Sequence, residues 1–190
     1  MIGLLRRLDR ALAAIEVTAS WLSALALFSI MWIVGIDVGM RYLLNRPFGW
    51  SYDVISLYVI VALFFLTLSR TFAVNGHINV DLLHHVLPRR GRYACEVVIC
   101  ALSAVFFALL TKAGADRALE AYEAGDVLAG SYPWPTWASV AFMPLGAGLL
   151  TLRLVLSGLC HAVSLATGRE VLPLPAIAGS AEAIAQRGFE

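Results

Sequence analysis

The chain has 190 residues, of which 60% are hydrophobic and 14% charged, and its formal net charge is +1. A soluble domain is typically about 45–50% apolar and about 25% charged. The chain therefore has too few charged residues to cover the surface of a soluble globule, which argues against a soluble enzyme. The nearly balanced charge also argues against a nucleic-acid-binding protein.

Four long runs contain no Asp, Glu, Lys or Arg: residues 17–36, 54–69, 97–111 and 127–152. A helix needs roughly 20 residues to cross a hydrocarbon core of about 30 Å. The two shorter runs reach that length if the charged residues beside them lie at the interfaces. The sequence therefore predicts an all-α integral membrane protein, a bundle of four transmembrane helices at about 13–36, 52–74, 93–115 and 136–160.

Basic residues decide the predicted orientation, because Arg and Lys concentrate in cytoplasmic loops. The N-terminal segment is basic, as is the connection between the second and third spans. Both termini are therefore expected in the cytoplasm. The first apolar run, at twenty residues, is too long for a signal peptide and is expected to be retained.

Charged residues near the span ends are expected to lie at the interfaces. Span one is expected to remain helical to about Arg41, which can neutralise Asp37 one turn earlier. Glu16, too, is placed at a span end, and Arg153 is expected to extend towards the inner surface. Span three is expected to continue as a charged helix through Ala115–Gly125.

Two segments outside the spans complete the expected organisation. Apolar residues at helical spacing in the connection 75–92 predict a short amphipathic helix on the cytoplasmic interface between helices 2 and 3. Residues 1–165 form the predicted membrane domain, and 166–190 a partly disordered cytoplasmic tail.

The histidines of the sequence raise two hypotheses for a cofactor site, a metal and a haem. His77, Asp81 and His85 are spaced by four, so one helix face could present them to a metal, but a fourth ligand is not obvious. A bis-histidine haem would need histidines facing each other inside the membrane, where the sequence has none. No motif pairs a nucleophile with a base, and no span has the central break of a transporter's discontinuous helices. We therefore expect no metal, no cofactor and no enzymatic activity, and an accessory subunit of a larger assembly.

Three segments resemble the small membrane (Q-type) subunit of tripartite ATP-independent periplasmic (TRAP) transporters. The first is Asp37-Val-Gly-Met-Arg41-Tyr42 with Asn45-Arg-Pro47-Phe-Gly-Trp50-Ser-Tyr-Asp53. The second is Arg70-Thr-Phe-Ala-Val-Asn-Gly76-His77-Ile78-Asn-Val80-Asp81 with Leu87-Pro88. The third comprises Gly125, Pro133, Trp137, Pro144, Gly146 and Arg153. The resemblance covers about residues 10–160, and Asp53 stands where the family more often has Glu.

The resemblance implies a location in the inner membrane of a bacterial or archaeal cell, and it implies a function that composition cannot show. In such systems a periplasmic solute-binding protein captures an organic anion, and a large membrane subunit moves it inward with a sodium gradient. The small subunit is expected to be a fixed scaffold in the lipid membrane that packs against the large permease subunit and helps to receive the binding protein. The alternative is a membrane-anchoring cytochrome b or quinone-binding redox subunit.

The resemblance also implies roles for individual residues. Asp37 and Arg41 would hold the end of span one or contact the large subunit, and Trp50 and Asp53 would anchor the start of span two. His77 and Asp81 would cap and orient the amphipathic helix. The alternative for each residue is an ordinary interface charge or membrane-belt aromatic. The other candidate interface or structural residues are Arg70, Gly76, Pro133, Trp137 and Gly146.

Overall fold

The computed structural model describes residues 2–77, 87–129, 132–168 and 170–174. The helices are α1 (Ile2–Leu44), α2 (Ser51–Val54), the π-helical turn η1 (Ile55–Val59), α3 (Ile60–Ala73), α5 (Arg89–Glu123) and α6 (Thr136–Thr167). The predicted amphipathic helix falls on residues 78–86, outside the described part of the chain.

Among the described residues, four helices are long and apolar enough to cross a membrane: α1, the continuous unit α2–η1–α3, α5 and α6. The predicted all-α class with four transmembrane helices is therefore confirmed. Two helices also continue where the sequence predicted: α1 past Arg41 to Leu44, and α5 to Glu123. Gly125, just beyond α5, has a φ of 65°, a left-handed conformation that glycine adopts without strain.

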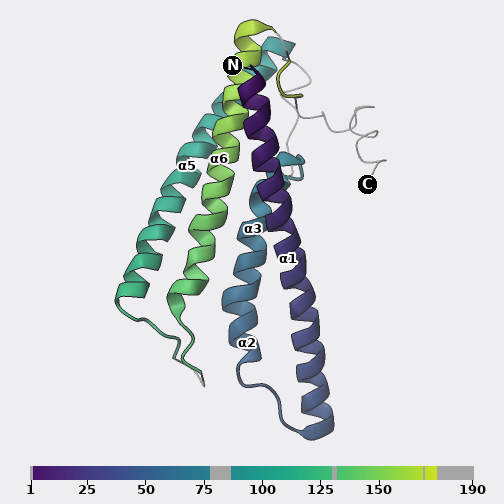
Figure 1. Ribbon diagram of the computed structural model, residues 1–190, viewed down its shortest axis with the longest axis vertical. Coiled ribbons are helices and arrows are strands. Elements are labelled where there is room, and N and C mark those ends of the chain that lie inside the picture. Colours follow the sequence, from purple (N-terminus) through teal and green to yellow (C-terminus); the bar gives the residue numbers. More distant parts are fainter. Residues whose placement is uncertain (1, 78–86, 130–131, 169, 175–190) are drawn as a thin grey trace.

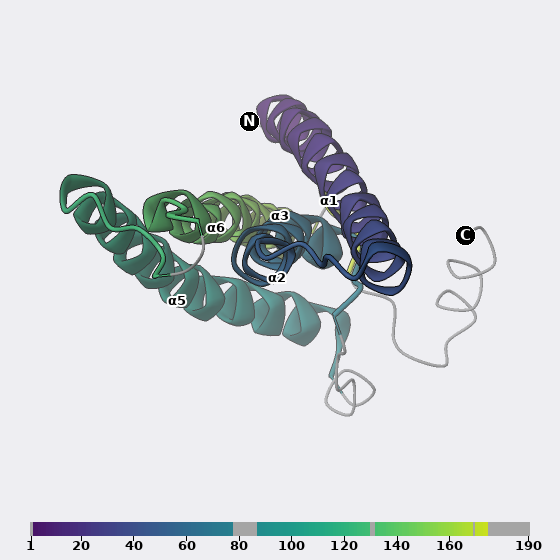
Figure 2. The ribbon, with the colours of Figure 1, turned by 90° about the horizontal axis from the view of Figure 1, so that it is seen from below.

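The bundle of four spanning helices is an open row. Figure 1 shows the order α5, α6, α3 and α1, and Figure 2 shows the same row from one end, with α5 and α1 on opposite sides. In the most apolar stretch of each helix, only 11% of residues are buried in α1 and 33% in α6. Most of the apolar surface of this chain is therefore left for lipid or for another protein.

Helix α1 packs against the row through one regular seam. Its buried residues are separated by seven, four, three and four residues, a spacing that keeps one side of a helix facing a neighbour. They are Leu5, Leu12, Glu16, Ala19 and Ser23. Because Glu16 belongs to this seam, the fold brings a carboxylate into the interior of the row.

Glycines allow α6 to approach both of its neighbours closely. A Cβ at Gly146 would lie 2.1 Å from the carbonyl oxygen of Phe65 in α3, and one at Gly158 would lie 3.2 Å from the Cβ of Cys100 in α5. No side chain fits at Gly146 unless the backbones move apart, so this glycine sets the distance between α3 and α6.

The helices converge at the end of the row where the chain begins and α6 ends (Figure 1). A buried cluster joins α1 and α6 there, comprising Leu5, Leu12, Leu156 and Cys160, with Val171 and Leu172 packed against it. The N–H of Val171 donates to the Oγ of Ser164 (3.1 Å). Residues 170–174, which belong to the predicted tail, thus rest on the converging ends, while 175–190 lie outside the described residues.

Candidate functional site

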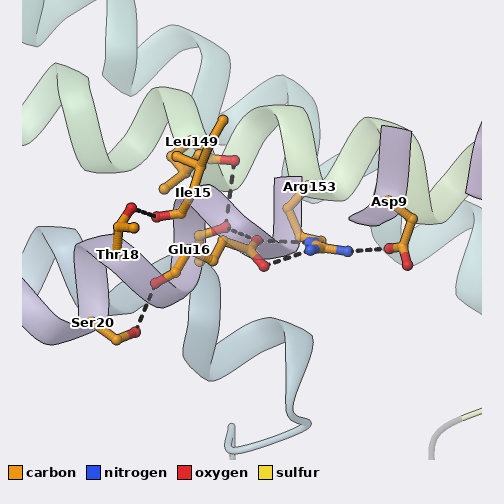
Figure 3. A network of polar contacts seen from close by, with 8 residues as sticks. Asp9, Ile15, Glu16, Thr18, Ser20, Leu149 and Arg153 are labelled. Atoms are coloured by element: carbon orange, nitrogen blue, oxygen red, sulfur yellow. Dashed lines mark hydrogen bonds and ion pairs between the residues drawn. The ribbon is translucent and has the colours of Figure 1, made fainter. Parts of the chain in front are cut away.

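The most deeply buried charges lie where α1 crosses α6. Figure 3 shows Glu16 from α1 facing Arg153 from α6, with Asp9 on the other side of the guanidinium. The Nε of Arg153 donates to Glu16 Oε1 at 2.7 Å and its Nη2 donates to Glu16 Oε2 at 2.5 Å. The Nη1 donates to Asp9 Oδ1 at 2.6 Å. One guanidinium thus binds two carboxylates seven residues apart on α1.

A third helix contributes to the same network. Ser69 of α3 donates its hydroxyl proton to Glu16 Oε1 at 2.6 Å. Glu16 and Ser69 are fully buried and Arg153 is 5% exposed, whereas the side chain of Asp9 is 34% exposed. The network therefore has a buried, fully hydrogen-bonded centre and one carboxylate that reaches its edge.

This geometry is suited to holding helices together rather than to chemistry. Moving a charge out of water costs several kcal/mol, which the pair recovers only when its remaining hydrogen-bonding positions are satisfied. Here both oxygens of Glu16 and three nitrogens of Arg153 have partners. All three nitrogens of the Arg153 guanidinium donate to Glu16 or Asp9. These described contacts leave no guanidinium nitrogen without a partner to bind a substrate.

The prediction that Arg153 extends towards the inner surface is wrong, and Glu16, which the sequence placed at a span end, is fully buried. Both side chains point into the row, because an opposite charge is available there and neither needs to reach water. A signal was present in the sequence: Asp9 and Glu16 are seven residues apart, so they share a helix face. Their shared partner, Arg153, could not be predicted from the sequence, because it is 137 residues away from Glu16.

A second polar cluster holds the other end of α1. The Nη2 of Arg41 lies 3.3 Å from Asp37 Oδ2, the i, i+4 pairing that the sequence predicted. The second oxygen of Asp37 accepts the backbone N–H of Phe48 at 2.6 Å. Phe48 stacks on Trp50, with ring centroids 5.4 Å apart. Asp37 thus fastens the connection to α2 as well as its own helix.

Three further candidate residues do not share a cluster in the described structure: Asp53 at the start of span two, and Pro133 and Trp137 near the start of span four. Asp53 lies in the first turn of α2, half-buried. Pro133 is exposed, and Trp137 meets Tyr122 of α5 edge-to-face at 5.6 Å. Nearby, Tyr58 in η1 donates to the carbonyl of Pro135 at 2.5 Å, a contact between α6 and the second span that the sequence did not indicate.

At the opposite end, the second predicted motif is only partly described. Arg70 lies in the last turn of α3. The N–H of Gly76 donates to the carbonyl of Thr71 (2.8 Å), and His77 lies 6.3 Å from the ring of Phe72. Asp81 is outside the described residues, so the predicted capping pair with His77 stays a prediction. His85, which the metal hypothesis needs, is outside them as well.

The structure therefore gathers Asp37, Arg41 and Trp50 into one cluster and leaves the other described candidates dispersed. The fold defines a class: a polytopic membrane protein whose polar groups connect its own helices. The family model described as "Tripartite ATP-independent periplasmic transporters, DctQ component" matches residues 30–163. The chain belongs to this family, the small component of TRAP transporters. Neither the search of curated proteins nor that of solved structures gave a match.

Proposed function

We propose that this chain is the scaffold for the large permease subunit of a TRAP transporter that takes up an organic anion, a carboxylate, by binding-protein-dependent, sodium-driven symport. The observation that carries the proposal is the family match over residues 30–163, which makes the chain a small TRAP transporter subunit and a multi-pass protein of the inner membrane. The large permease subunit and the periplasmic solute-binding protein are its proposed partners.

The scaffold role is supported by the open row. A closed bundle would bury its apolar residues internally, whereas α1 and α5 leave theirs exposed along their length, including Phe28 (54%), Trp32 (59%) and Phe106 (61%). A flat array of helices offers a broad surface to a larger membrane protein. The ion network and the glycine contacts fix the positions of the helices, as a support requires.

The roles of individual residues follow from their contacts. Asp37 and Arg41 hold the outer end of α1 and the turn that follows it. Gly146 holds α6 against α3. Both termini lie in the cytoplasm in this proposal, which places the network of Glu16 and Arg153 in the inner half of the membrane.

The test is reconstitution from separate components. A tagged copy of this chain is expected to co-purify with the large permease subunit, and uptake into proteoliposomes is expected to require both membrane subunits, the binding protein and an inward sodium gradient. Sodium-dependent uptake by this chain alone, or full uptake by the large subunit without it, would overturn the scaffold role. A Soret band in the purified subunit would instead support the redox alternative.

A further inference from the structure

The short segment 170–174 lies beyond α6, at the end of the row where α1 begins (Figure 1). Gly168 ends α6 with a φ of 67°, a left-handed conformation that turns the chain away from the helix axis. Val171 and Leu172 then pack, half-buried, against the cluster that joins α1 to α6 and contains Cys160. The segment therefore covers part of the contact between these two helices.

Two polar contacts fasten the same segment to the helices beside it. The Oε2 of Glu170 lies 2.7 Å from the Nη2 of Arg89 in the first turn of α5, and the two side chains are 47% and 66% exposed. The N–H of Val171 donates to the Oγ of Ser164 in α6, a residue that is buried. Residues 170–174 thus connect α5 and α6 while they rest on the contact between α6 and α1.

These contacts are weak enough for the segment to open while the helices stay together. An exposed ion pair shifts an equilibrium by at most about fivefold, and a neutral hydrogen bond shifts it by about fivefold. Val171 and Leu172 are only half-buried, so each contributes less than a fully buried side chain. The buried pair of Glu16 and Arg153 joins α1 to α6 independently of the segment. Segments held by few buried contacts open locally, without global unfolding.

We propose that residues 170–174 form a reversible clasp, which when closed covers the α1–α6 cluster and shields Cys160, and when open exposes that cluster. The clasp determines how firmly the first turns of α1 are held against α6, because Leu5 and Leu12 of α1 belong to the cluster that it covers. The inference goes beyond the scaffold role and does not depend on it, since every contact of the clasp lies within this chain.

The test measures how fast N-ethylmaleimide modifies each cysteine of the full chain in detergent, with the modified peptides quantified by mass spectrometry. Cys160 and Cys100 are 3% and 1% exposed, so each thiol reacts only through an opening of its surroundings. Full burial of one methylene contributes about fourfold. V171A/L172A removes five half-buried carbon atoms and is therefore expected to speed the modification of Cys160 at least about tenfold. Cys100 packs between α5 and α6, against Gly158, and its rate is expected to stay at the wild-type value.

Two single substitutions separate the clasp from a direct effect of charge on the thiol. E170Q and R89Q break the same ion pair but change the local charge in opposite directions, so an opening clasp predicts a rise of about threefold at Cys160 in both. The matched control is E120Q, which breaks an exposed ion pair with Arg117 and is expected to leave the rate at Cys160 unchanged. An unchanged rate in V171A/L172A, or equal rises at Cys160 and Cys100, would overturn the proposal. Opposite changes in E170Q and R89Q would overturn it as well.

Discussion

Replacing Glu16 with alanine tests whether the buried network holds the row of helices together. The substitution removes the acceptors of two Arg153 nitrogens and of the Ser69 hydroxyl, because all three donate to Glu16. Of the hydrogen bonds described for the Arg153 guanidinium, the one to Asp9 remains. Since the guanidinium is 5% exposed, it cannot regain these hydrogen bonds from water without leaving its packed position.

The expected loss follows from this burial. Removing one partner of a buried ion pair costs about 3–5 kcal/mol, because an uncompensated charge remains. The double variant E16L/R153M removes both charges and retains apolar volume, and Asp9 can turn to water from its 34% exposed position. We expect the double variant to lose less than about 2 kcal/mol, and therefore less than either E16A or R153A alone.

The assay is reversible unfolding in mixed micelles of increasing SDS content, followed by circular dichroism and tryptophan fluorescence. The control is R117A, which breaks surface ion pairs of a side chain that is 58% exposed and is expected to cost under about 1 kcal/mol. A loss in E16A no larger than in R117A would refute the reasoning. So would strictly additive losses from E16A and R153A in the double alanine variant.

Two further substitutions test contacts described above. G146A places a Cβ 2.1 Å from the Phe65 carbonyl oxygen and is expected to cost about 1–3 kcal/mol of overpacking in the same unfolding assay; G35A, with nothing within 4 Å, is the matched control, and equal stability of the two would contradict the close approach. D37A loses the Arg41 pair and the Phe48 N–H bond, so it is expected to lose about 1.5–3 kcal/mol and to lower the yield of complex with the large subunit without abolishing insertion. Wild-type yield and uptake in D37A would reduce Asp37 to an ordinary surface charge.

The number of spanning helices and their type could be predicted from the sequence, because the positions of the charged residues indicate where each span begins and ends. Long uncharged runs are incompatible with a water-exposed surface, so four of them indicate four spanning helices. The pair of Asp37 and Arg41 could also be predicted from the sequence, because an i, i+4 spacing places two side chains on one helix face. Both inferences require information from within one helix only.

The order of the helices in the row and the partner of Arg153 could not be predicted in this way. The helices are apolar on nearly every side, so hydrophobic periodicity does not tell which side meets a neighbour. An arginine near a span end is satisfied equally by water at the interface or by a distant carboxylate. Choosing between them requires knowing that α1 crosses α6, which no local pattern encodes.

Because Glu16 and Arg153 are 137 residues apart, the ribosome makes them at different times. A ribosome adds about 5–20 residues per second, so Glu16 is synthesised roughly 7–27 s before the arginine that neutralises it. During that interval a deeply inserted α1 would carry an unpaired carboxylate, which favours a shallow position with Glu16 still in contact with water. Arrival of α6 then allows α1 to settle, so the synthesis of α6 completes the insertion of α1.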